Sequence, residues 1–218
     1  MFTGIAKLYL SNYLPALENF QNAEKILLEY RVYGRTLAAS KNIASCYSYL
    51  HFNEKAKDQF SKVLKEAKRI RRRDIEDMCY INLSNIHFKQ GDYLSAIEHG
   101  KRVVDESDCI HYIAMAWSYF FLEDYDMCKK CRNKLKEFDD YYLSMMVELL
   151  DLYIAGSNSN IKIDVLERMI DFSERNECQN DVLWCIRFLI NEYRIQGDYQ
   201  KVAEYQEFVL KRLGYQSF

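Results

Sequence analysis

The chain has 218 residues, of which 49% are hydrophobic and 28% are charged, and this composition excludes an intrinsically disordered protein. A formal net charge of −2 gives no overall attraction to nucleic acid or to anionic membranes. One proline and seven glycines favour long helices over many short strands. No apolar run reaches the length of a membrane span, so we expect neither a membrane helix nor a signal peptide.

The first hairpin is predicted to have a second helix at 13–30 and a short first helix at 2–10. Gly4 falls where Ala44 and Ser84 fall in the later hairpins, which leaves almost no helical turn before it. We therefore expect this hairpin to be incomplete, either because the protein has an unusual cap or because an upstream effector domain is missing.

Five complete helical hairpins are predicted to follow, at about 33–70, 73–106, 108–138, 140–176 and 179–213. The turn in the second of these contains Gly91, which can end a helix in the left-handed conformation, and Asp92, which can cap the next helix. The turn at 156–160 is the flexible polar run of the chain. The sequence therefore predicts helix–turn–helix pairs throughout.

A small residue recurs early in the second helix of these hairpins. Ala16, Ala56 and Ala96 are each 40 residues apart, and Cys128 and Val202 take the corresponding places later. Two helices approach closely there, and a larger side chain would push them apart. The residues Leu83 and Ser84, the Gly-Asp-Tyr turn at 91–93 and Ala96 resemble a tetratricopeptide repeat (TPR).

This resemblance implies an all-α fold, a right-handed superhelix of about six TPR-like hairpins (an α-solenoid), in a single domain at 1–218. A solenoid normally protects its ends with a polar cap. An uncovered C-terminal helix would favour a homodimer through Tyr205, Phe208 and Val209. The alternative is that the tail at 214–218 folds back over them.

The first helix of each hairpin carries a core stripe, and a neighbouring stripe is expected to face the concave surface. The core stripe consists of Ile43, Tyr47, Leu83, His87, Met115, Tyr119, Leu189 and Tyr193. The candidate peptide-binding residues on the neighbouring stripe are Lys41, Asn42, Ser45, Tyr49, Asn82, Asn85, Lys89, Trp117, Phe121, Arg187, Asn191 and Arg194. A concave repeat surface commonly binds peptides or proteins, so this stripe is the predicted binding site.

Each residue type on this stripe suits a different part of a peptide. An asparagine amide both donates and accepts hydrogen bonds, so Asn82, Asn85 and Asn191 can pair with the backbone of an extended peptide. Lysine and arginine can hold carboxylates, including a C-terminal one. Aromatic side chains such as those of Trp117 and Phe121 can form an apolar pocket. The alternative is a wet groove of polar side chains without a ligand.

The sequence offers little for catalysis or metal binding. Cys128 and Cys131 form a C-x-x-C, but it lies inside a predicted helix and has no second pair. The four histidines lack metal-ligand spacing, and no phosphate loop or nucleophile elbow is present. We expect no enzyme, no cofactor and no metal; a metal or redox protein built on the two cysteines is the weakest alternative. The seven cysteines lack the spacing of a disulfide framework, which favours reduced thiols in a cytoplasmic protein.

The strongest charge run is 68–73, which reads KRIRRR. It could contact phosphates, but it ends a helix, where cations complement the helix dipole. Asp74, Glu76 and Asp77 follow at once and are expected to pair with it. An isolated basic run rarely forms a nucleic-acid site without a wider positive face, so we expect no direct nucleic-acid binding by this chain.

Beyond the generic repeat, the chain resembles the RRNPP family, the peptide-pheromone receptors of Gram-positive bacteria. The resemblance rests on the 40-residue spacing, the long helices, the asparagines Asn82, Asn85 and Asn191, and the segments IHFKQGDYLSAIEHGKRV at 86–103 and NEYRIQGDYQKVAEYQEFVLKRL at 191–213. In that family a reimported signalling peptide binds the concave face, changes the superhelix and so controls a DNA-binding or protein-inhibiting part. The sequence departs from that family in showing no DNA-binding helix-turn-helix pattern ahead of the repeats, so we expect no DNA binding by this chain alone.

The resemblance implies a bacterial, cytoplasmic quorum-sensing module that regulates transcription or a signalling partner when a short linear peptide binds in the groove. The alternative is a constitutive TPR scaffold or adaptor that docks another protein and takes no small ligand. A narrow polar channel would favour the first hypothesis, and a broad apolar surface would favour the second.

Overall fold

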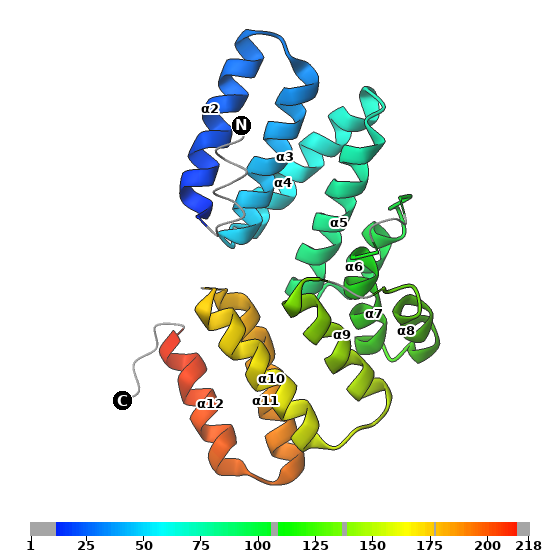
Figure 1. The fold of residues 1–218 in the computed structure, drawn as a ribbon, viewed down its shortest axis with the longest axis vertical. Coiled ribbons are helices and arrows are strands. Elements are labelled where there is room, and N and C mark those ends of the chain that lie inside the picture. The colour runs from blue at the N-terminus through cyan, green and yellow to red at the C-terminus, as the bar shows by residue number, and fades with distance from the viewer. Residues whose placement is uncertain (1–11, 106–108, 137–138, 177, 213–218) are drawn as a thin grey trace. The chain divides into compact units, whose positions relative to one another are not determined.

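The computed structural model describes residues 12–105, 109–136, 139–176 and 178–212. Every regular element in these ranges is an α-helix, which confirms the all-helical prediction (Figure 1). No helix within them is both long and apolar enough to cross a membrane. The chain divides into two compact units, Met1–Leu135 and Lys136–Phe218, and each is described by itself. The single repeat domain and the superhelix stay predictions.

The first unit contains seven described helices, and each packs against the next along the chain. In addition, α3 contacts α5, and α5 contacts α7, so the first helices of successive hairpins form one layer. The helices are α2 (Tyr13–Glu29), α3 (Tyr33–Tyr49), α4 (Asn53–Arg69), α5 (Arg73–Gln90), α6 (Tyr93–Gly100), α7 (His111–Phe121) and α8 (Tyr125–Arg132).

The second unit contains four described helices that also pack in sequence order. They are α9 (Tyr141–Ile154), α10 (Ser159–Arg175), α11 (Gln179–Gln196) and α12 (Tyr199–Arg212). The five complete hairpins begin within three residues of their predicted starts, but α6 and α8 end at Gly100 and Arg132, six residues before the predicted ends at 106 and 138. The predicted helix at 2–10 and the tail at 214–218 lie outside the described residues.

The turns between helices use the chemistry that the sequence indicates. Gly91 and Gly197 end α5 and α11 in the left-handed conformation, with φ of 81° and 77°. Asp92 and Asp124 cap the helices that follow, because their carboxylates accept the backbone N–H groups of Ser95 and Met127 at 3.2 and 3.1 Å. Within the described residues, four turns place a residue other than glycine at positive φ, namely Arg31, His51, Arg71 and Glu123.

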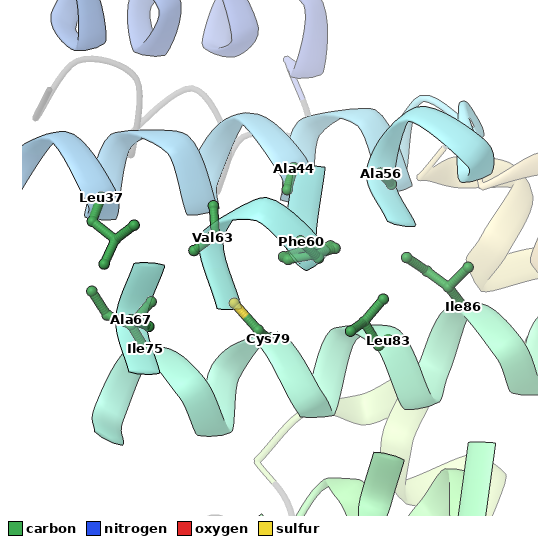
Figure 2. Close-up of a cluster of buried hydrophobic side chains, with 10 residues drawn as sticks. All are labelled: Leu37, Ala44, Ala56, Phe60, Val63, Ala67, Ile75, Cys79, Leu83 and Ile86. Atoms are coloured by element: carbon green, nitrogen blue, oxygen red, sulfur yellow. The ribbon is translucent and has the colours of Figure 1, made fainter. Parts of the chain in front are cut away.

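The core of the first unit is formed where α4 lies between α3 and α5 (Figure 2). Phe60 and Val63 of α4 point into the cluster, together with Leu37 of α3 and Cys79 and Leu83 of α5. The predicted small positions Ala16, Ala56, Ala96 and Cys128 are all fully buried. At one of them, the hydroxyl of Ser84 donates a 2.7 Å hydrogen bond to the carbonyl of Ala96, which joins α5 to α6. These contacts confirm the close approach of the paired helices.

Candidate functional site

The layer formed by α3, α5 and α7 brings three of the predicted groups of residues together in the first unit. Ala44 and Ser84 occupy matching positions one repeat apart, so Asn42 matches Asn82 and Ser45 matches Asn85. Tyr49 matches Lys89 in the same register. The asparagines therefore recur on neighbouring helices of one layer, as the sequence predicts.

The side chains of Asn42 and Ser45 on α3 lie mostly inside the protein. They are 7% and 8% exposed, and the hydroxyl of Ser45 donates to the carbonyl of Lys41 at 3.3 Å. Tyr49 is half exposed, and its ring stacks on that of Tyr13 with centroids 4.8 Å apart. In this structure Asn42 and Ser45 therefore offer little surface to a ligand, whereas Tyr49 offers one face of its ring.

Lys41 is the most unusual of the predicted residues. Its side chain is half-buried, and no carboxylate of the described residues lies within ion-pair distance of the ammonium. Burial lowers the pKa of the Lys41 ammonium, and the opposing effect of nearby Cys79 and Asp74 is smaller. A partly desolvated cation without a counter-ion is a favourable place for an anionic group.

On α5, Asn82 and Asn85 are both half-buried. The Asn82 amide nitrogen donates to the Met78 carbonyl at 2.7 Å, which leaves its amide oxygen available. Asn85 makes no side-chain hydrogen bond within the described part of the chain. Met78 and Lys89 are exposed on the same helix. This helix therefore presents two amides with unused hydrogen-bonding capacity.

On α7, the two predicted aromatic residues take part in packing. Trp117 is fully buried, with its ring near those of Phe120 and Phe121. Phe121 is half-buried and stacks on Tyr93 at 4.7 Å between centroids. The indole of Trp117 has no exposed surface in this structure. The apolar binding pocket at Trp117 therefore stays a prediction. Residue type alone does not show whether an aromatic lines a groove or fills the core.

The remaining predicted residues, Arg187, Asn191 and Arg194, lie on α11 in the second unit. All three are exposed, and their spacing of four and three residues places them on one side of the helix. Neither arginine forms an ion pair with a described residue. They form a separate basic surface of the second unit.

Several residues that the sequence assigned to packing or ion pairing are buried or paired in the structure. Cys128 and Cys131 are both buried, and burial raises the pKa of the Cys131 thiol to about 11. Among the described residues, no cluster of three potential ligands could hold a metal. His87 packs its ring on His99 at 5.2 Å between centroids. Asp74 pairs with Arg72, and Glu76 pairs with Arg73. The expected pairing of the basic run with the acidic residues that follow is therefore confirmed.

Sequence reasoning missed a buried polar cluster in the second unit. Glu192 on α11 is fully buried and accepts a hydrogen bond from the hydroxyl of Tyr153 on α9. Lys162 on α10 lies beside the same carboxylate. The sequence did indicate that Glu192 would be buried. It falls three residues after Leu189 and one before Tyr193, inside the predicted core stripe.

Comparison of the chain with protein-family models finds no matching family, and comparison with curated proteins finds no matching relative.

Proposed function

We propose that the chain is a peptide-binding sensor module built from TPR-like hairpins that form a right-handed superhelix. The observation that carries this proposal is the half-buried Lys41 ammonium without a carboxylate partner among the described residues. It lies on α3, next to the helix that presents Asn82 and Asn85. A cation that needs an anion, beside amides that can both donate and accept, suits a short peptide with a carboxylate.

In this proposal the amides of Asn82 and Asn85 pair with the N–H and C=O groups of the peptide backbone, since an amide both donates and accepts hydrogen bonds. Lys41 holds a carboxylate of the peptide, either terminal or on a side chain. The bound peptide shifts the arrangement of the hairpins, and this shift controls an attached DNA-binding domain or a signalling partner in the cytoplasm.

The test is isothermal titration of the full chain with a library of short synthetic peptides, each made with a free and with an amidated C-terminus. We expect binding that weakens by about tenfold in Asn85→Ala, the loss expected for one hydrogen bond to a ligand. Lys41→Met should weaken binding of the free-acid peptides more than that of the amides. Lys62→Met is the matched control, since Lys62 pairs with Asp58 on the exposed side of α4. Equal binding by all four proteins would refute the site assignment.

The second candidate function is a constitutive adaptor that docks a folded protein. The observation in its favour is that two large hydrophobic side chains of this layer are exposed, Met78 on α5 and Tyr49 on α3. An adaptor would bind no short peptide in the titration. Binding of its partner protein would instead be lost when Met78 and Tyr49 are both changed to serine. Lys41→Met and Asn85→Ala would have no effect on that binding.

A further inference from the structure

Five cations gather at one edge of the first unit, where the α2–α3 turn, the start of α3, the end of α4 and the α4–α5 turn meet. We call this surface the basic edge, and its cations are Arg31, Arg35, Lys65, Lys68 and Arg71. The side chain of Lys68 lies over the ring of Tyr80, and none of the five side chains pairs with a carboxylate of the described residues. The basic edge is therefore a surface of uncompensated positive charge.

The two turns come together through the packing of α3 on α4. A Cβ atom on Gly34 would lie 3.5 Å from Nη1 of Arg72, so the start of α3 touches the α4–α5 turn. Leu37 of α3 shares a buried cluster with Ala67 of α4, the residue directly before the basic run (Figure 2). Figure 1 shows both turns at the same end of the unit. The run at 68–73 is therefore not isolated, because Arg31 and Arg35 extend it across a second turn.

The carboxylates at this edge are largely neutralised by other arginines. Glu66 pairs with Arg69, and Asp74 pairs with Arg72. Glu29 is the one carboxylate of 29–35 and 65–74 without a partner among the described residues. The five unpaired cations therefore outweigh the unpaired acid at this edge, and a surface with this surplus attracts a polyanion.

Two exposed tyrosines alternate with the arginines in the segment Tyr30-Arg31-Val32-Tyr33-Gly34-Arg35. Tyr30 and Tyr33 are 76% and 62% exposed, so their rings are free to stack on a ligand. Arg31 and Arg71 hold matching places 40 residues apart and have φ of 55° and 58°, a conformation in which glycine would be unstrained. Other described turns hold His51 and Glu123 in this conformation, so the backbone does not require a cation at either position.

We propose that the basic edge binds single-stranded nucleic acid. Arginine and lysine contact the phosphates, and unpaired bases stack on Tyr30 and Tyr33, which is how proteins hold single strands without reading their sequence. The exposed rings favour this ligand over a duplex, whose bases are already stacked. The exposed rings also favour single-stranded nucleic acid over an acidic protein segment. Such a segment would pair with the cations but would leave the tyrosine rings without a stacking partner. This proposal concerns a different surface from the peptide site.

The first test titrates the full chain into fluorescently labelled oligo(dT) and follows the fluorescence anisotropy. The oligonucleotide has about 12 nucleotides, which is within the usual site size of single-strand binders. We expect the chain to bind oligo(dT). The logarithm of the association constant should fall linearly with the logarithm of the salt concentration, with a slope of about −0.7 for each phosphate contacted. Arg31→Glu with Arg71→Glu should weaken binding by at least about tenfold. The double variant Arg35→Glu with Lys65→Glu should do the same without changing a residue at positive φ.

The matched control is Lys129→Glu with Lys130→Glu, two exposed lysines on α8 that give the same change in net charge. If this control weakens binding as much as the edge variants, the attraction belongs to the whole unit and the proposal is wrong. Absence of salt-dependent binding by the unaltered chain also overturns it. Lys41→Met and Asn85→Ala should leave oligo(dT) binding unchanged, so failure of the peptide site and failure of the basic edge are separate results.

The tyrosines are tested by a second pair of variants. Tyr30→Ala with Tyr33→Ala should weaken oligo(dT) binding by about tenfold or more, whereas Tyr30→Phe with Tyr33→Phe should keep it, because stacking needs the ring and not the hydroxyl. Duplex DNA of equal length should bind more weakly than oligo(dT). Equal binding of the duplex would overturn the stacking step. Tighter binding of poly-L-glutamate than of oligo(dT) would assign the edge to an acidic protein instead.

Discussion

The hydroxyl of Tyr153 on α9 donates a 2.8 Å hydrogen bond to Oε1 of Glu192, a fully buried carboxylate on α11. The ammonium of Lys162 on α10 lies 3.6 Å from the same oxygen and 4.5 Å from the centre of the tyrosine ring. Burial, followed by the bond to Glu192, raises the pKa of the Tyr153 phenol, so it stays a hydrogen-bond donor. Three helices of the second unit therefore meet at one buried charge.

Removing the donor to this carboxylate should destabilise the second unit. We predict that Tyr153→Phe lowers the free energy of unfolding by about 1–3 kcal/mol, because a buried acceptor loses its partner. Urea denaturation followed by circular dichroism measures the change. Tyr199→Phe is the control, since Tyr199 is exposed on α12 and its hydroxyl makes no described contact. A loss of similar size in both variants would show that Tyr153 has no special role.

Removing the Lys162 ammonium alone should lower the free energy of unfolding more than removing Lys162 and Glu192 together. We predict that Lys162→Met lowers the free energy of unfolding by about 3–5 kcal/mol, because it leaves the Glu192 charge buried without compensation. Lys162→Met combined with Glu192→Met should cost less than the single change, since apolar residues of similar volume can replace a buried ion pair. If the double variant proves the less stable of the two, Glu192 is not held as an anion by Lys162.

The close approach of α6 and α7 makes Gly100 sensitive to added volume. A Cβ atom at Gly100 would lie 2.5 Å from Cγ and Sδ of Met115, so Gly100→Ala forces this buried side chain to move. We predict a loss of about 1–3 kcal/mol in the free energy of unfolding, as is usual for overpacking. At Gly34 of α3 the nearest atom to a new Cβ is the end of an arginine at 3.5 Å. Gly34→Ala is therefore the control, and a neutral or stabilising result is expected there.

The cysteines should differ widely in reactivity. Cys178 is the one partly exposed thiol among the described residues, whereas Cys46, Cys79 and Cys131 are buried. Burial raises the pKa of Cys46 to about 11 and that of Cys79 to about 12, so almost no thiolate forms at these sites near neutral pH.

We predict that a disulfide reagent at pH 8 labels Cys178 first, and that the other thiols react together as the protein unfolds in urea. Cys178→Ser should abolish the fast phase of colour release. Fast labelling of Cys128 or Cys131 in the native protein would show a reactive C-x-x-C and revive the redox alternative. Mass spectrometry of the labelled peptides distinguishes these results.

The hairpin boundaries were predictable because they depend on neighbours along the chain. Gly91 and Asp92 end one helix and begin the next through their own backbone and side-chain chemistry. Ala56 and Ala96 are buried where the sequence places small residues, since the crossing point of a hairpin recurs with the repeat. The asparagines of α3 and α5 likewise fall on neighbouring helices, because a constant repeat length keeps equivalent positions in register.

The sequence by itself determined the helical fold class, the hairpin boundaries and the core stripe, because each is set by periodicity within about ten to twenty residues. Only the tertiary structure decided that Trp117 is buried, that Glu192 meets Tyr153 and Lys162, and that Gly34 lies beside Arg72 of the run at 68–73. These environments depend on contacts between helices distant in the chain. A helical pattern shows which face of a helix is apolar, but not which side chains of another helix lie opposite it.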